Sequence, residues 1–338
     1  MVVSRMNVCG GLCMIWISEL ARNNEPKTAV QDQLKESVTR GTALTVGNFD
    51  GIHHGHRQLI AKLLSIGKEK HLPTIVFTFK PHPRVILRPE LPFFRLFDQL
   101  DQKEVLEGMG VDILYEENFT KDVSALSATE FFESRWVNVL NVKELIVGYD
   151  FSFGRERQGN IEFLKQICLR HAIQMTVVEP FVMNGEIVSS STIRRLLQHG
   201  EVEKAENFLG RSYYLRGVVI KGFQRGRLIN VPTANINPEI HFLPRRGVYF
   251  TITTVLGKEY KSITNIGFNP TFQSRNQDDI AQLKVETHIL NFDQDIYESN
   301  ISVQLCHFLR DEMKFSSIDQ LKSQIHLDIQ ACQKYFKE

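Results

Sequence analysis

The sequence predicts an α/β domain followed by a β domain, and three observations support this fold class. From residue 43 to about residue 195, short apolar strands alternate with stretches of helical spacing, a rhythm typical of a parallel sheet with helices on both faces. Beyond Gly210, strand-like stretches follow one another with little helix between them, which predicts an antiparallel sheet or closed barrel. From Ile318 onward, helical spacing returns and predicts a terminal helix.

Length, charge and cysteine content limit the possible classes of protein. The 338 residues are enough for two domains of ordinary size. With 40 Lys and Arg against 39 Asp and Glu, the net charge of +1 gives no general attraction to nucleic acid or anionic lipid. The five cysteines are scattered without a Cys-x-x-Cys pair, which favours a reduced, cytoplasmic protein. No apolar run reaches the roughly 18 residues of a membrane span, so we expect no membrane partner.

Residues 1–40 are expected to form an N-terminal extension or leader. The stretch 8–17 is fairly apolar and follows Arg5, which faintly suggests a signal peptide. It lacks a small-residue cleavage site, and the residues after it are polar. We therefore favour an unstructured extension or an edge strand over a signal for export.

The first predicted strand, 43–46, leads into the first candidate site. It is followed by the turn Gly47-Asn-Phe-Asp-Gly51 and then by His53-x-Gly-His56, which opens an amphipathic helix. A strand, a glycine-bearing turn and a helix N-terminus together cradle phosphate with backbone N–H groups. Both histidines would lie on one face and stabilise negative charge that develops on phosphate oxygens. A solvated loop or a partial metal site are the alternatives, and no Walker A motif is present.

The rest of the first half continues the α/β rhythm. Strands are predicted at 74–79, 112–115, 144–147 and 174–178, with helices at 101–109 and 128–140. The turns 47–56, 80–83 and 148–154 each follow a strand, so we expect them to converge on one cleft.

A helix with a hydroxyl-rich start closes this half. Ser190 and Ser191 can cap that helix and donate hydrogen bonds, and Arg194 offers a fork for phosphate; ordinary capping is the alternative. The expected domain limits are 41–195 and 213–338, joined by a linker helix at 196–212.

The second half carries a separate candidate site. Strands are predicted at 213–220, 247–255, 260–266, 283–290 and 301–308. Gly226 lies in a glycine-bearing loop that can fold over phosphates, and Thr233 and Asn235 could offer oxygens to Mg²⁺. Glu286, on a later strand, could take the proton from an attacking hydroxyl, as phosphoryl transfer requires. The alternatives are an ordinary turn and an exposed strand residue.

These stretches together resemble the bacterial bifunctional riboflavin kinase/FAD synthetase family. The matching stretches, in family order, are Gly47–Gly51 with His53-x-Gly-His56, Pro81-His-Pro83, Gly148-x-Asp-Phe-x-Phe-Gly154, Ser190-Ser191-x-Ile-Arg194, Gly210-Arg211-x-Tyr213, Gly226-Arg227, Pro232-Thr-Ala-Asn235, Gly247-Val-Tyr249, the stretch from Asn265 to Phe272, Glu286-x-His-Ile-Leu290 and Phe308-Leu-Arg310.

The resemblance implies a Rossmann-like nucleotidyltransferase domain that converts FMN to FAD, then a riboflavin kinase barrel that makes FMN. ATP, riboflavin and FMN would be the small-molecule partners and Mg²⁺ the cofactor, in a monomer or weak homo-oligomer. The implied residues, by role, are His53, His56 and Glu286 for catalysis; Gly47, Phe49, Asp50, Gly55, Ser190, Ser191, Arg194 and Gly226 for ATP phosphates; Asp150, Phe151, Phe153 and Arg310 for flavin; and Thr233 and Asn235 for the metal.

Three positions depart from the family pattern. Lys80 stands where a Glu is expected, which reverses a charge near the cleft, and Asn230 replaces a usual glycine. Asn291 replaces a common Asp. None of them is a predicted metal ligand, base or member of the histidine pair, so we expect both activities. The alternatives are one retained activity, or a flavin-binding protein without turnover.

Overall fold

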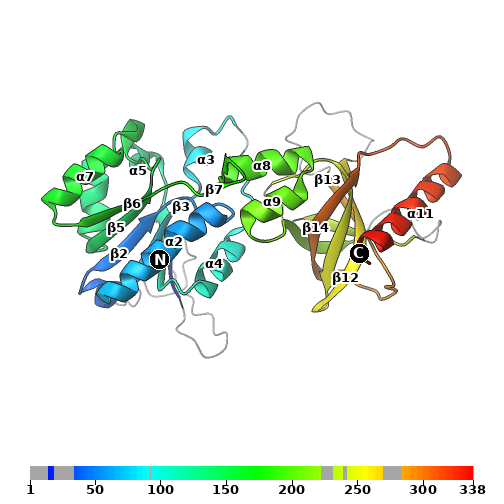
Figure 1. The fold of residues 1–338 in the computed structure, drawn as a ribbon, viewed down its shortest axis with the longest axis horizontal. Helices are drawn as coiled ribbons and strands as arrows, with labels where there is room; N and C mark the ends of the chain where they lie inside the picture. The colour runs from blue at the N-terminus through cyan, green and yellow to red at the C-terminus, as the bar shows by residue number, and fades with distance from the viewer. Residues whose placement is uncertain are drawn as a thin grey trace. The chain divides into compact units, whose positions relative to one another are not determined.

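The computed structural model describes residues 14–18, 34–91, 93–221, 231–238, 242–268 and 283–337. The chain divides into two units, the first ending at Val188 and the second beginning at Ser189 (Figure 1). The domain limits expected from the sequence stay a prediction.

A six-stranded sheet forms the first unit, in the order β1-β4-β3-β2-β5-β6. Every neighbouring pair in it is parallel. The expected parallel sheet is confirmed, and the N-terminal stretch contributes an edge strand. The strands are β1 (Ile15–Ser18), β2 (Thr42–Val46), β3 (Thr74–Lys80), β4 (Ile113–Asn118), β5 (Val142–Gly148) and β6 (Gln174–Val178).

Helices cover both faces of this sheet because its strands alternate apolar side chains between two cores (Figure 1). On one face, Ala43 and Ile146 pack with residues of α2 (His54–Lys70) and α4 (Gln99–Gly108). On the other, Leu44 and Phe77 pack with the fully buried Trp136. The elements of that second face are α6 (Ala128–Phe131), η1 (Phe132–Val137) and α7 (Ile161–Arg170).

Some elements differ from expectation. The helix expected at 128–140 is a short α-helix, α6, that continues as the π-helix η1. The stretch expected as one linker helix belongs to two helices, because Gly200 adopts φ 79° and ends the first of them. The elements not yet named are α3 (Pro83–Leu87), α5 (Lys121–Ala125), η2 (Arg155–Arg157), the hairpin β7 (Val182–Met183) and β8 (Glu186–Ile187), α8 (Ser190–His199) and α9 (Val202–Leu209).

The second unit contains a closed barrel of antiparallel strands in the order β10-β13-β12-β11-β14-β9, which confirms the expected barrel. Strand β10 was not expected, because Pro232 and Asn235 are typical turn residues. The terminal helix α11 (Ile318–Tyr335) packs Cys332 against the barrel. The barrel strands are β9 (Tyr214–Ile220), β10 (Ala234–Pro238), β11 (Gly247–Val255), β12 (Lys258–Phe268), β13 (Leu283–Ile289) and β14 (Asn300–Arg310).

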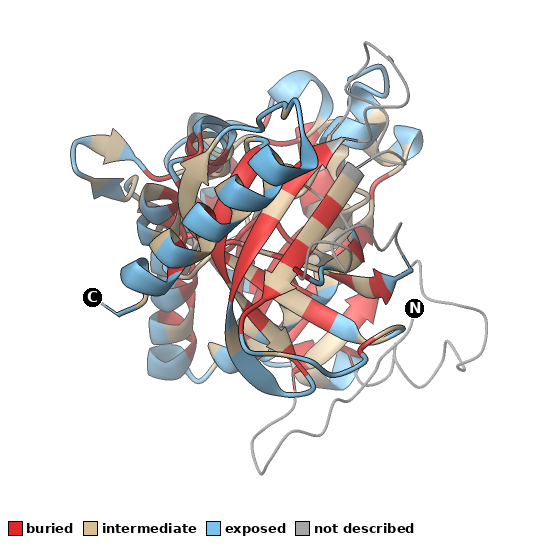
Figure 2. Cartoon of the chain, turned by 90° about the vertical axis from the view of Figure 1, so that its right-hand side faces the viewer, coloured by how far each residue is buried: buried red, intermediate tan, exposed pale blue. Residues whose placement is uncertain are grey.

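Buried positions alternate with more exposed ones along several of the barrel strands (Figure 2). Several of the buried positions carry hydroxyl groups that hydrogen-bond to one another. Thr251, for example, lies within 2.7 Å of the Ser262 hydroxyl and 2.9 Å of the Thr264 hydroxyl. The barrel interior is therefore partly polar but internally satisfied.

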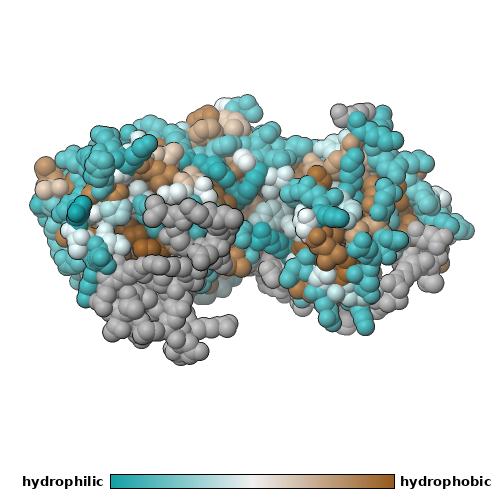
Figure 3. All heavy atoms as spheres, turned by 90° about the horizontal axis from the view of Figure 1, so that it is seen from below, coloured by the Kyte–Doolittle hydropathy of each residue, from teal (hydrophilic) through white to brown (hydrophobic). Residues whose placement is uncertain are grey.

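Polar side chains cover much of the described surface in Figure 3, with small apolar areas between them. Within the described ranges, no helix combines the length and apolar character that crossing a lipid bilayer requires.

A buried ion pair stabilises the wall of the first unit. Arg135 in η1 donates from Nε to Glu117 at the end of β4 at 2.7 Å, and the Glu117 side chain has no exposed surface. We expect Arg135→Met to lower the free energy of unfolding by about 3 kcal/mol, because a buried carboxylate loses its cation. Urea unfolding followed by tryptophan fluorescence measures this unit alone, since Trp16 and Trp136 are the two tryptophans.

The exposed Lys165–Glu162 pair provides the matched control. Its side chains are 60% and 70% exposed, so Lys165→Met should change the free energy of unfolding by less than about 0.5 kcal/mol. Equal effects of the two substitutions would show that burial of Glu117 does not govern the energy of its ion pair.

Candidate active sites

The turn between β2 and α2 holds the two histidines against each other. His53 is the N-cap of α2, and its Nδ1 accepts a hydrogen bond from the His56 backbone N–H at 3.3 Å. The two rings stack with their centroids 3.7 Å apart. The expectation that they share one face is confirmed, so both rings can address the same ligand.

The His56 ring is electrostatically poised to bind as a neutral group. Burial lowers its pKa well below the usual value, and the neighbouring His53 lowers it further. Nδ1 of His56 is buried and has no hydrogen-bond partner in the described part of the chain. Because a buried polar atom is normally satisfied, this nitrogen is available to hydrogen-bond with a bound ligand or water.

The lowered pKa of His56 predicts a pH-dependent stability. The unfolded histidine titrates near pH 6.5, and the folded one at lower pH. The contribution of His56 to the free energy of unfolding is therefore fully present above about pH 6.5. It is lost as the pH drops below that value, because only the unfolded state then takes up the proton. This one group contributes up to about 1.4 kcal/mol per pH unit.

His56→Asn should remove that contribution. The measurement is urea unfolding without nucleotide between pH 7.5 and 5.5, comparing the slope of stability against pH in the two proteins. Identical slopes would mean that His56 titrates normally in the folded chain.

Other residues of the turn fix its conformation. Asp50 is buried, and its Oδ1 accepts a hydrogen bond from the Leu96 backbone N–H at 2.9 Å. Phe49 is buried with φ 47°, a left-handed conformation. A Cβ at Gly55 would lie 3.2 Å from the His53 ring, and one at Gly47 3.2 Å from the Phe49 ring. Both glycines thus permit close packing inside the turn.

Two residues that were not predicted from the sequence also hold this turn in place through hydrogen bonds. The Asn48 carbonyl accepts hydrogen bonds from Arg95 Nη2 and Gln102 Nε2, each at 3.4 Å. Nε of Arg95 and Oδ1 of Asn48 are buried without a hydrogen-bond partner in the described residues. Unsatisfied polar atoms therefore gather around this turn, as expected for a polar binding site.

Lys80, the first departure from the family pattern, faces a polar cluster. Its ammonium group donates to Gln99, which in turn donates to the buried Glu116. Lys80 is not among the residues that line the cavity described next. Gln99 therefore links the Lys80 ammonium group to a buried carboxylate.

A cavity of about 850 Å³ lies over the carboxyl ends of the sheet strands. Gly47, Pro83 and Asp150 all line it, so the expectation that three turns converge on one cleft is confirmed. Most of its walls are aromatic or aliphatic, which suits a planar organic ligand. The aromatic lining residues are Phe79, Phe119, Phe131, Phe151 and Phe153.

The remaining predicted phosphate residues lie at the start of α8, in the second unit. Ser190 and Ser191 are its first residues, and Ser189 caps it by accepting from the Thr192 backbone N–H at 3.1 Å. The Arg194 guanidinium lies 5.9 Å from the Phe242 ring centroid. Their part in phosphate binding stays a prediction.

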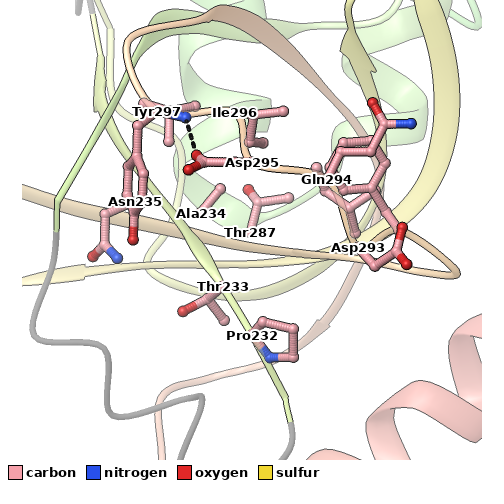
Figure 4. A pocket seen from close by; sticks show the side chains of 13 residues that line it. Pro232, Thr233, Ala234, Asn235, Thr287, Asp293, Gln294, Asp295, Ile296 and Tyr297 are labelled. Atoms are coloured by element: carbon pink, nitrogen blue, oxygen red, sulfur yellow. Dashed lines mark hydrogen bonds between the residues drawn. The ribbon is translucent and has the colours of Figure 1, made fainter.

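The second unit has its own pocket, of about 310 Å³, at the start of β10 (Figure 4). Thr233 and Asn235 both line it, and alternate residues of an extended strand point to the same side. Asp293 and Asp295, in the loop between β13 and β14, line it as well, and Oδ1 of Asp295 accepts from the Tyr297 backbone N–H at 3.1 Å. The sequence reading had not assigned that loop.

Glu286 lies directly opposite Asn235 across the β10–β13 pair. Opposite residues of antiparallel strands share one face, so the register brings the proposed base beside a proposed metal ligand. Glu286 also pairs with Lys284 at 2.8 Å. Asn265, which begins one of the stretches that resemble the family, lies opposite Glu286 on β12.

His288 fixes the segment that carries Thr233. Its Nδ1 lies 2.7 Å from the Pro232 carbonyl, and since a carbonyl only accepts, the ring donates. Burial lowers the pKa of His288, and this hydrogen bond partly opposes the shift.

Two other expected residues of this unit can be placed only in part. Arg310, expected at the flavin, makes an ion pair with Asp328 of α11 at 2.7 Å. Its role stays a prediction. Gly226 and Asn230 lie outside the described residues.

The α/β unit carries a histidine-bearing turn, and the barrel that follows it in the chain has a pocket lined by hydroxyl, amide and carboxylate groups. This combination suits a transferase with two nucleotide-using centres. Residues 35–192 match the FAD synthetase family, and residues 209–336 match the riboflavin kinase family. The chain belongs to the bifunctional riboflavin kinase/FMN adenylyltransferase family.

Individual relatives agree with this assignment. The bifunctional riboflavin kinase/FMN adenylyltransferase of Haemophilus influenzae is 35% identical over 300 residues, covering 88% of this chain and 96% of its own. That of Escherichia coli K12 is 33% identical over 304 residues, covering 90% and 95%. A solved structure described as a macrolide-efflux protein from Streptococcus pneumoniae is 29% identical, with a TM-score of 0.77 over 89% of this chain and 96% of that one.

Proposed function

We infer that the protein phosphorylates riboflavin to FMN with ATP and then adenylylates FMN to FAD, releasing pyrophosphate. The observation that carries this conclusion is that one chain holds both centres, each matched along its length to its own enzyme family. The two reactions form a sequence, because the product of the barrel unit is the substrate of the α/β unit.

For adenylyl transfer, we propose that a phosphate oxygen of FMN attacks the α-phosphorus of ATP while the bond to pyrophosphate breaks. His53 and His56 would donate hydrogen bonds to phosphate oxygens as their negative charge grows. A neutral His56 suits this role, since a neutral imidazole still has one N–H to donate. Gly47 and Gly55 would allow the backbone to approach the phosphates, and Ser190, Ser191 and Arg194 would hold them.

For phosphoryl transfer, we propose that Glu286 accepts the proton of the ribityl 5′-hydroxyl as that oxygen attacks the γ-phosphorus of ATP and the bond to the leaving ADP breaks. The lining of the pocket suits Mg²⁺, because Thr233, Asn235, Asp293 and Asp295 all contribute oxygen-bearing side chains to it. The ion would neutralise phosphate charge, and Thr233 and Asn235 would hold it. Among the described residues, no cluster of three His, Cys, Asp or Glu side chains could hold a metal ion.

The test is a chromatogram of the flavins formed from riboflavin and ATP, with Mg²⁺ or with excess EDTA. We expect FMN first and FAD later with Mg²⁺, and neither with EDTA. Accumulation of FMN alone, or use of supplied FMN alone, would indicate a single activity. Flavin binding without consumption of ATP would indicate a non-catalytic protein.

We also propose that the protein works in the cytoplasm as a monomer or weak homo-oligomer. The supporting observation for a reducing compartment is that Cys168, Cys306 and Cys332 form no disulfide.

A further inference from the structure

We propose that Arg157 binds the 5′-phosphate of FMN in the cavity of the first unit, and so selects FMN over riboflavin for adenylyl transfer. This inference rests on the proposed adenylyltransferase function of that unit. It adds a specificity-determining residue that none of the family motifs quoted above contains.

The loop that carries Arg157 is held in a defined shape. Phe153 and Gly159 exchange two backbone hydrogen bonds, of 3.1 and 2.9 Å, and so close the loop at its base. Inside it, Glu156 has φ 54° and Arg157 has φ 61°. Left-handed non-glycine residues are energetically unfavourable and tend to occur where function requires a special backbone.

The guanidinium group of Arg157 is held through Nε, and its Nη groups can bind a ligand. Its Nε donates to the Ser152 hydroxyl at 2.7 Å, and both residues line the cavity. Neither Nη atom has a partner in the described part of the chain. A guanidinium fixed through Nε presents two parallel N–H groups, the geometry that matches two phosphate oxygens.

The other arginines of the cavity are less suited to this role. The Arg84 guanidinium lies 5.7 Å from the Phe93 ring centroid, and the side chain of Arg88 has no anchor in the described residues. Of the three arginines, Arg157 alone has a side chain that a hydrogen bond orients and Nη groups without a partner in the described residues.

The charges of the cavity support recognition of an anion. Three arginines and two carboxylates, those of Asp150 and Glu156, line it, which leaves one positive charge in excess. The flavin ring can pack on the aromatic walls with or without the phosphate. Riboflavin lacks the phosphate, so the two N–H groups of Arg157 (the arginine fork) add nothing to its binding free energy. The fork therefore discriminates between the two flavins.

The experiment compares two constants for adenylyl transfer in the full-length chain carrying Glu286→Gln, a change that prevents phosphorylation of riboflavin during the assay: the KM for FMN and the inhibition constant of riboflavin competing with FMN. Arg157→Gln should raise the KM for FMN by about 10- to 100-fold, the equivalent of one charge-assisted hydrogen-bond pair. The inhibition constant of riboflavin should change by less than about 3-fold, because riboflavin has no phosphate for the fork to bind. Arg157→Lys, which keeps the charge without the fork, should fall between wild type and Arg157→Gln.

Arg155→Gln is the matched control, because Arg155 is exposed in the same turn but does not line the cavity; its KM for FMN should equal that of wild type. An unchanged KM in Arg157→Gln, or a parallel rise of the riboflavin inhibition constant, would overturn the proposal. If Arg157→Gln fails to fold, Arg157→Lys and Ser152→Ala decide, and wild-type KM values in both would overturn it. Wild-type protein that forms no FAD from FMN would instead refute the proposed function.

Discussion

Replacing His56 with asparagine should lower the rate of FAD formation from FMN by about 10²–10³-fold, the usual loss when one preorganised donor to a developing negative charge is removed. Asparagine keeps polarity and a donor but cannot reproduce the imidazole stacked 3.7 Å from His53. The measurement is kcat for FAD formation at saturating ATP and FMN. His56 is the better target of the pair, because His53 also caps α2.

FMN formation by the same variant is the internal control. Because the barrel has its own pocket and its own proposed base, riboflavin phosphorylation should stay within about 2-fold of wild type. His54→Asn is the matched variant, since His54 lies between the two histidines but stacks on Phe181 instead. If His54→Asn lost as much adenylyl transfer as His56→Asn, the loss would reflect damage to the helix start.

The sequence was sufficient to predict features that depend on local chemistry. Apolar stretches such as 43–46 and 74–79, bounded by glycine or proline, predicted the strands of the first sheet. The histidine spacing predicted that the two side chains share one face, but not that their rings stack. Strand β10 was missed because Pro232 and Asn235 favour turns in isolation. Its pairing with β9 and β13 overrides that preference, and no single stretch of sequence contains this information.

The residues that the sequence reading missed depend on contacts between distant segments. Arg95 reaches the Asn48 carbonyl from 47 positions along the chain, and nothing near Arg95 marks it as part of the site. Arg157 lies close to a motif, but only the closed loop and the cavity reveal its orientation. The surroundings of Lys80 have the same origin, because its hydrogen-bond partner Gln99 and the Glu116 carboxylate behind it come from α4 and β4.

Glu286→Gln should have the other large effect, lowering kcat for FMN formation by about 10²–10⁴-fold, as expected for loss of a general base. Glutamine has the size of glutamate but cannot accept the proton of the attacking hydroxyl. The substitution also removes the partner of Lys284, 2.8 Å away, but both side chains are partly exposed, so we expect little change in stability. FAD formation from supplied FMN verifies folding of the rest of the chain.

A matched variant separates the base from an ordinary exposed strand residue. Glu259 is an exposed carboxylate on β12, so Glu259→Gln should phosphorylate riboflavin at the wild-type rate. A base and a metal ligand differ in their response to Mg²⁺: if Glu286 is the base, excess Mg²⁺ will not restore the rate of Glu286→Gln. Restoration by Mg²⁺ would assign Glu286 to the metal site beside Asn235. A rate within about 3-fold of wild type would leave the barrel without the base that its strand register implies.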